Sequence, residues 1–194
     1  MNLFHLYFGL GIHHILNFEA YDHILFIITL VAVYQLKHWK KIVILVTAFT
    51  LGHTTTLALA TLGILRVQAT LVEFLIAVTI FLTSITNLLQ KSDKFSRRVH
   101  LFKYSLAMFF GLIHGLGFSS YLRSLLGSEQ SILVPLFSFN LGVEAGQLVL
   151  VTVIILTNYL LIRFFSMRQH DWRLVLSGAG MGVSVILMGS RWPW

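Results

Sequence analysis

Long apolar segments follow one another along nearly the whole chain, and they constrain its fold more than any other feature. Crossing the hydrocarbon core of a bilayer requires about 20 predominantly apolar residues, with a usual range of about 17–25. Five segments meet this requirement, at residues 42–62, 69–90, 102–122, 131–162 and 173–190. Of the 194 residues, 57% are hydrophobic and only 11% are charged, which is too little polar surface for a water-soluble domain. The sequence therefore predicts an all-α integral membrane protein.

Two further apolar segments precede these five. Residues 21–36 are slightly short for a span and begin with Tyr-Asp-His. Residues 3–16 number about 14, which is below the length of a span and leaves three alternatives open: a re-entrant segment, an interfacial helix or a seventh span. The sequence therefore predicts a single transmembrane domain over residues 1–194, built as a bundle of six transmembrane helices plus a short N-terminal apolar helix.

The positions of the basic residues predict how the bundle is oriented. Connections at 37–41, 91–101 and 163–172 are rich in Lys and Arg, whereas 63–68 and 123–130 hold one Arg each. Because basic loops stay on the cytoplasmic side, six consecutive spans place the three basic connections in the cytoplasm and the C-terminus outside. The net charge of +7 therefore reflects orientation, with membrane lipid and not nucleic acid as the partner.

Few ionisable side chains lie within the spans, and those that do are grouped. A charge in the hydrocarbon core costs about 2.5–3.5 kcal/mol even on the lenient insertion scale, so such a residue needs a partner or a task. The predicted topology brings imidazoles and carboxylates toward the outer half of the bundle, whereas independent structural residues would have scattered more evenly. The candidate metal ligands are His13, His14, Asp22, His23, His53, Glu73, His114, Asn140 and Glu144.

The candidate ligands combine imidazole nitrogen with carboxylate oxygen, which suits a borderline divalent transition metal such as nickel, cobalt or zinc. Asn140, Glu144 and Gln147 stand at i, i+4 and i+7 and form one polar stripe on their helix. Glycine pairs at small-xxx-small spacing predict close packing of neighbouring helices. These pairs are Gly111/Gly115, Gly142/Gly146 and Gly178/Gly182. The absence of cysteine excludes disulfides and thiolate metal sites.

Three functions are compatible with these residues. A divalent-metal permease would bind its ion weakly at several sites and pass it on through the His/Asp/Glu-lined site. An intramembrane hydrolase would hold zinc with three histidines and a carboxylate, and activate a water molecule. In a non-catalytic membrane accessory protein, the polar core would be structural. The burden of buried ionisable groups makes the permease the first of the three hypotheses, although the permease and the hydrolase would use the same residues.

The same motifs resemble those of the HupE/UreJ family of small integral membrane proteins, over His13 to about Gln147. They are, in order, His14 with Asp22-His23-Ile-Leu-Phe26, Thr47-Ala-Phe-Thr-Leu-Gly-His53-Thr, Val72-Glu73, His114-Gly115-Leu-Gly117-Phe118 and Phe139-Asn140-Leu-Gly142-Val-Glu144-Ala-Gly146-Gln147. Two positions depart from the family's pattern: Ile15 stands where proline is common, and Ala20 stands where the family has glycine. Both departures fall beside the predicted entry to the site.

The resemblance implies a permease for nickel or cobalt, associated with hydrogenase and urease accessory functions. The metal ion is then the transported substrate, with nickel as the first expectation and cobalt or zinc as alternatives. The resemblance also implies an integral protein of a bacterial inner (cytoplasmic) membrane. A homo-oligomer is compatible with the sequence.

Overall fold

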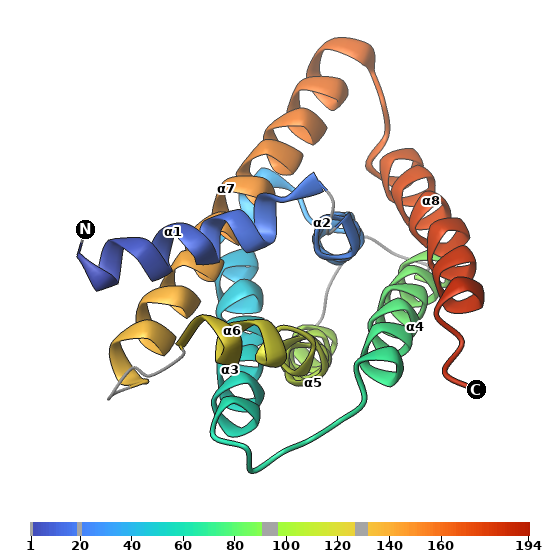
Figure 1. Cartoon of the computed structure of the whole chain (residues 1–194). Helices are drawn as coiled ribbons and strands as arrows, with labels where there is room; N and C mark the ends of the chain where they lie inside the picture. The colour runs from blue at the N-terminus through green and yellow to red at the C-terminus, as the bar shows by residue number, and fades with distance from the viewer. Residues whose placement is uncertain (1, 19–20, 91–96, 127–131) are drawn as a thin grey trace.

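The chain forms a bundle of helices (Figure 1), and the computed structural model describes residues 2–18, 21–90, 97–126 and 132–194. The elements in chain order are α1 (Leu3–Leu16), α2 (Tyr21–Val31), the 3-10 helix η2 (Leu36–His38), α3 (Trp39–Thr61), α4 (Ala69–Leu88), α5 (Arg97–Gly117), α6 (Ser119–Leu126), α7 (Leu133–Phe165) and α8 (Gln169–Ser190). All of them are helical, which confirms the all-α class. Of the predicted basic connection at 91–101, residues 91–96 lie outside the described part.

Among the described residues, five helices are long and apolar enough to cross a membrane by themselves, namely α3 (with η2), α4, α5, α7 and α8. Helices α1 and α2 pass the same test only as a pair, and they are bent by 71° at their junction, as in a broken span or a re-entrant loop. With 14 residues, α1 is about 21 Å long and too short to cross a core of about 30 Å alone. The chain is therefore an integral membrane protein, and its described residues form five candidate transmembrane helices, or six when the bent pair counts as one span.

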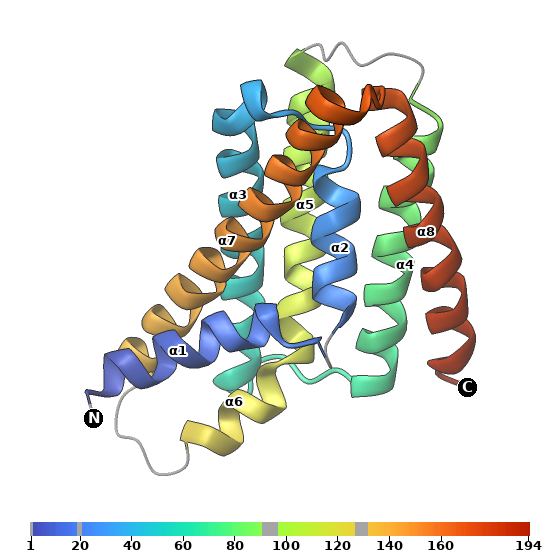
Figure 2. The same ribbon diagram turned by 90° about the horizontal axis from the view of Figure 1, so that it is seen from above.

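The helices run between two ends of the bundle that differ in what they carry. Figure 2 shows η2 and the connection between α7 and α8 at one end, which we call the η2 end, and α6 with both chain termini at the other, which we call the α6 end. The basic connections predicted at 37–41 and 163–172 thus lie at the same end, as the predicted alternation requires. The predicted span 102–122 is split, because α5 stops at Gly117 and the short helix α6 follows.

Three helix pairs make most of the contacts in the bundle: α3 with α5, α1 with α7 and α4 with α8. Glycines bring the backbones of the first two pairs together. A Cβ on Gly111 of α5 would collide with the carbonyl oxygen of Phe49, and a Cβ on Gly142 of α7 would collide with that of Phe8. The two predicted glycine pairs that contain these residues therefore act as close-packing sites.

The third predicted glycine pair, Gly178/Gly182 on α8, does not act in this way. A Cβ at either position would meet no atom of the described residues within 4 Å. Instead Gly180, which lies between them, approaches Thr29 of α2 and Ser84 of α4. Positions two apart on a helix differ by about 200°, so the face of α8 that carries Gly180 is nearly opposite to the face that carries Gly178 and Gly182. Spacing alone does not tell which of two glycine rows faces the neighbouring helices.

Helix α2 ends inside the bundle, before the predicted segment 21–36 does. Side chains of neighbouring helices replace the missing helical hydrogen bonds. Asn87 of α4 donates to the carbonyl oxygen of Thr29 over 2.7 Å, and Gln169 of α8 donates to that of Ala32 over 3.0 Å. The chain can therefore leave the helix at this depth without leaving these carbonyls unpaired in an apolar environment.

Candidate metal centre

Four imidazole rings meet in the half of the bundle nearer the α6 end. His14 lies near the end of α1, His23 at the start of α2, His53 within α3 and His114 near the end of α5. The ring centroid of His14 lies 4.4 Å from that of His23 and 6.2 Å from that of His53. The ring centroids of His23 and His114 lie 5.4 Å apart. We call these four residues the histidine cluster. Side chains from four different helices thus form one group.

Phenylalanine rings shield the histidine cluster from water. The ring centroids of Phe26 and Phe49 lie 4.8 Å and 5.1 Å from the centroid of His114. His53 and His114 are each only 1% exposed. Electrostatic and hydrogen-bonding interactions are stronger in such apolar surroundings than in water, so the partner of each ring nitrogen matters.

Asn140 of α7 fixes the ring of His53. The amide nitrogen of Asn140 donates to the carbonyl oxygen of Leu136 over 2.8 Å, so its Oδ1 is the atom that faces the imidazole. Nδ1 of His53 lies 3.0 Å from this oxygen. Because an amide oxygen only accepts, Nδ1 carries the proton of the neutral ring and Nε2 keeps its lone pair.

Asp22 fixes the ring of His23 in the same sense. Nδ1 of His23 lies 3.0 Å from Oδ1 of Asp22, and an ionised carboxylate only accepts. Nδ1 therefore carries the proton in the neutral ring, and Nε2 keeps its lone pair. A carboxylate behind an imidazole is a common way to orient a metal-binding histidine.

Thr79 of α4 fixes the ring of His114, although the sequence analysis assigned Thr79 no role. Its hydroxyl donates to the carbonyl oxygen of Ile76 over 2.7 Å, so the Oγ1 atom accepts from Nε2 of His114 over 3.2 Å. The lone pair then lies on Nδ1 of His114. The signal that could have identified Thr79 is its place at i, i+4 and i+8 with Thr83 and Asn87 on one face of the helix.

One nitrogen of each ring in the histidine cluster has no hydrogen-bond partner among the described residues. These nitrogens are the buried Nε2 atoms of His14, His23 and His53 and the buried Nδ1 atom of His114. A buried polar atom without a partner costs free energy, so four such atoms in one cluster need an explanation, and ligand binding is one. Neutral imidazoles with one nitrogen held and the other free are the form in which histidine binds metal ions.

The free nitrogens are not arranged as one finished ligand set. Within the described residues, no group of three or more His, Cys, Asp or Glu side chains is positioned to hold a metal ion. The rings are gathered, but they would have to turn about their side-chain bonds before several of them could contact one ion.

Arg191 links the predicted carboxylates Asp22 and Glu73, although it was not among the predicted site residues. Its guanidinium Nη1 lies 3.0 Å from Oδ2 of Asp22, and its Nε lies 3.8 Å from Oε2 of Glu73. Asp22 is nearly buried and Glu73 is half exposed, so the three residues lead from the surface to His23. The ring of Trp192 packs on that of Phe74 in α4, with centroids 5.3 Å apart, and this contact keeps the neighbouring Arg191 beside Glu73. The signal was the position of Arg191 directly after the last predicted span, at the end of the bundle where the predicted topology also places Asp22 and Glu73.

Two predicted ligands lie away from the histidine cluster. His13 is exposed, because its side chain is turned by about 100° around α1 from that of its neighbour His14. Glu144 accepts a hydrogen bond of 2.6 Å from Thr47, which precedes His53 by six residues, or about 9 Å along α3. Gln147 accepts from Thr50 over 3.0 Å, so the polar stripe of α7 pairs with threonines of α3 on the side of the cluster facing the η2 end.

Comparison with known proteins agrees with the motifs that carry this centre. A family model described as HupE/UreJ protein matches residues 1–192, which is essentially the whole chain. No curated protein matches the chain, and no solved structure does. The matched range extends beyond Gln147 and includes the last span. The chain therefore belongs to the HupE/UreJ family.

Proposed function

We propose that this membrane protein is a permease for a divalent transition-metal ion, with nickel as its first candidate substrate. The observation that carries the proposal is the hydrogen bonding of His23, His53 and His114, which leaves one lone pair of each ring free within the cluster. Free, oriented imidazole nitrogens suit nickel, cobalt or zinc. Membership of the HupE/UreJ family fits a nickel-related accessory or transport role, and it makes nickel the first choice.

The ion would enter from the α6 end through the carboxylates of Asp22 and Glu73. These groups offset the charge of a divalent cation, which neutral imidazoles cannot do. Arg191 now occupies both carboxylates, so an arriving cation would have to take its place beside Asp22. The ion would exchange its water first for Asp22, His23 and His14.

Transfer through the bundle would then proceed from ring to ring. His53 and His114 lie next in the cluster, and Glu144 lies beyond them toward the η2 end. A carrier needs binding that is favourable enough to admit the ion and weak enough to release it. Rings that are gathered without forming a finished ligand set suit such binding better than a closed structural site does.

We place the η2 end in the cytoplasm and the α6 end outside. The support is the distribution of charge, because Lys37, Lys40, Lys41, Arg163 and Arg168 all belong to the η2 end. Basic residues stay preferentially on the cytoplasmic side of a membrane. With this orientation the histidine cluster lies in the outer half of the bilayer, and transport is uptake.

Uptake measurements test the proposal. Cells that lack other nickel uptake systems should accumulate nickel when they express this chain, and His53→Ala or His114→Ala should reduce that accumulation to background. His13→Ala is the matched control, because His13 is exposed and outside the cluster; it should leave accumulation unchanged. Expression of each variant in the membrane is measured alongside.

The results that would overturn the proposal are equally concrete. Unchanged nickel accumulation on expression of the wild-type chain would exclude nickel uptake. One tightly bound zinc ion per chain that does not exchange would instead favour the intramembrane hydrolase. Metal content that is the same in the wild type and in His53→Ala would favour a structural role for the polar core.

A further inference from the structure

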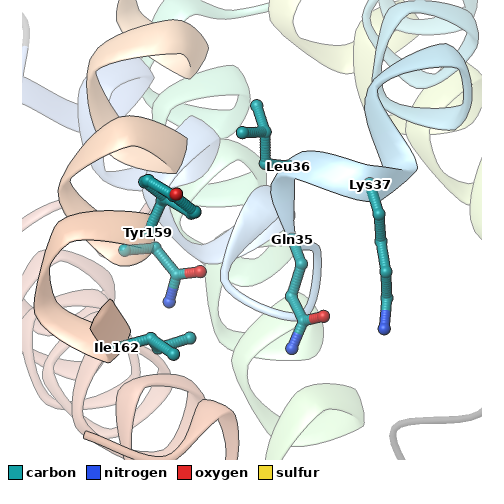
Figure 3. A pocket seen from close by; sticks show the side chains of 6 residues that line it. Gln35, Leu36, Lys37, Tyr159 and Ile162 are labelled. Atoms are coloured by element: carbon teal, nitrogen blue, oxygen red, sulfur yellow. The ribbon is translucent and has the colours of Figure 1, made fainter. Parts of the chain in front are cut away.

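A pocket of about 450 Å³ opens at the η2 end, far from the histidine cluster. Figure 3 shows the α2–η2 connection on one side of it and α7 on the other. Its lining residues are Gln35, Leu36, Lys37, Asn158, Tyr159 and Ile162. The proposed permease makes no use of any of them.

A second hollow of about 200 Å³ continues from this pocket between α3 and α7. Leu36 lines both hollows, so they adjoin. The lining of the second hollow includes Trp39, Val43, Val151 and Ile155, and it is almost wholly apolar. On α7 the two hollows follow one face, because Val151, Ile155, Asn158 and Ile162 are spaced at i, i+4, i+7 and i+11. Together they form a groove that starts at the η2 end and runs toward the middle of the bundle.

The two parts of the groove differ in polarity. In the pocket at the η2 end, Lys37 supplies a positive charge, and Asn158 supplies a buried amide, since this residue is only 1% exposed. Within the described residues, Nδ2 of Asn158 has no hydrogen-bond partner. A cation and an unused hydrogen-bond donor thus line the same pocket, and no carboxylate of the described residues lines either hollow.

We propose that this groove binds one anionic phospholipid of the leaflet at the η2 end. The phosphate would lie near Lys37 and accept a hydrogen bond from the Asn158 amide, since charge-assisted hydrogen bonds to phosphate are strong. An acyl chain would fill the apolar hollow between α3 and α7. A free phosphate ion would leave that hollow empty, and a zwitterionic lipid would leave the charge of Lys37 unmatched.

Binding of labelled lipids to the purified full-length protein tests the proposal. Fluorescent phosphatidylglycerol should bind more tightly than phosphatidylcholine carrying the same label. Lys37→Gln should reduce this preference about fivefold, the effect expected of one basic residue near an anionic lipid surface. Lys40→Gln is the matched control. It removes the same charge three residues further along the chain, and the side chain of Lys40 lines neither hollow, so the preference should change much less.

Two further measurements keep the outcome decisive. Ile155→Trp fills the apolar hollow and should weaken phosphatidylglycerol binding, while an excess of inorganic phosphate should not displace the lipid. Equal binding of the two lipids, an equal effect of Lys37→Gln and Lys40→Gln, or displacement by inorganic phosphate would each overturn the proposal. Because nickel accumulation is not the readout, failure here and failure of the proposed transport are distinguishable. Far-ultraviolet circular dichroism of each variant checks that the helices are intact.

Discussion

The two halves of the bundle both bury polar side chains, but they use them differently. In the half at the η2 end, the amide nitrogens of Asn87 and Gln169 donate to backbone carbonyls that the early end of α2 leaves without helical partners. In the half at the α6 end, Asn140 and Thr79 instead hold imidazole rings, and each ring keeps a second nitrogen unpaired among the described residues. The contacts of Asn87 and Gln169 stabilise the end of α2, whereas those of Asn140 and Thr79 orient imidazoles whose second nitrogen stays free to bind a ligand.

The difference teaches how to interpret polar residues in a membrane bundle. Burial alone does not separate the two roles, since Asn87 is as deeply buried as His53. The useful question is where the hydrogen bonds of each side chain end. A side chain that bonds to a backbone carbonyl stabilises the fold. An imidazole that is held through one nitrogen, and whose other nitrogen lies free in a group of histidines, indicates a ligand site.

The largest expected effect comes from breaking the packing that brings the histidines together. Gly111→Leu would place a side chain where Phe49 of α3 meets α5, so the α3–α5 pair that carries His53 and His114 could not close. Overpacking typically costs about 1–3 kcal/mol, and a clash with backbone lies at or above the upper end of that range. Thermal unfolding in detergent measures the effect.

The matched control for this substitution is Gly178→Leu on α8. A Cβ there would meet nothing within 4 Å among the described residues, so the melting temperature should stay close to that of the wild type. Equal losses at both positions would contradict the packing argument.

The second largest effect is expected from replacing one of two buried asparagines, Asn140 or Asn87, by leucine. Asn140→Leu releases Nδ1 of His53, so the ring can turn and change its tautomer. Loss of a side chain that orients a metal ligand typically lowers metal affinity about 10- to 100-fold. Calorimetric titration of the purified protein with nickel measures this loss.

Asn87→Leu is the comparison for that prediction. It removes the donor to the carbonyl of Thr29, and an unsatisfied buried acceptor costs about 1–3 kcal/mol of stability. Nickel affinity of the folded protein should be unchanged. If Asn87→Leu lowered nickel affinity as much as Asn140→Leu does, the distinction between the two halves would be wrong.

Most of the fold follows from hydrophobic patterning, because a membrane leaves the backbone few alternatives to long helices. The N-terminal helix Leu3–Leu16 coincides with the predicted segment, and the crossing helices agree with predicted spans to within a few residues. The early end of α2 could not be predicted, because its cause lies in side chains of α4 and α8 that are 58 and 137 residues distant in sequence. Local sequence carries no record of such contacts.

The candidate site shows the same limit. Grouped histidines predicted the cluster, since ionisable residues are scarce within spans and tend to have a task. The choice between the neighbours His13 and His14 required the direction of α1, and the position of Glu144 required the pairing of α7 with α3. Thr79 was overlooked because a threonine in a span usually bonds to its own helix, and its contact with His114 depends on how α4 packs beside α5.

The smallest expected effect concerns the mouth of the site. Arg191 lies between Asp22 and Glu73, so its single positive charge offsets part of the negative charge that would attract a divalent ion. Arg191→Gln removes that competing charge and should raise nickel affinity about fivefold, equivalent to about 1 kcal/mol for a partly exposed ion pair. Arg66→Gln, an exposed arginine in the connection between α3 and α4, is the matched control for the loss of one positive charge at the same end.

The sign of this effect separates two roles that the contacts of Arg191 allow. If the guanidinium competes with the metal ion, nickel affinity rises when it is removed, and the effect exceeds that of Arg66→Gln. If the guanidinium instead holds Asp22 in place behind His23, its removal frees the carboxylate to swing away from the ring, and nickel affinity falls. Competition is the stronger expectation, because Asp22 keeps its own contacts to the ring and to the backbone nitrogen of His23, at 3.0 Å and 2.9 Å, without the arginine. The carboxylate would therefore remain oriented toward the histidine cluster while its charge became available to the ion.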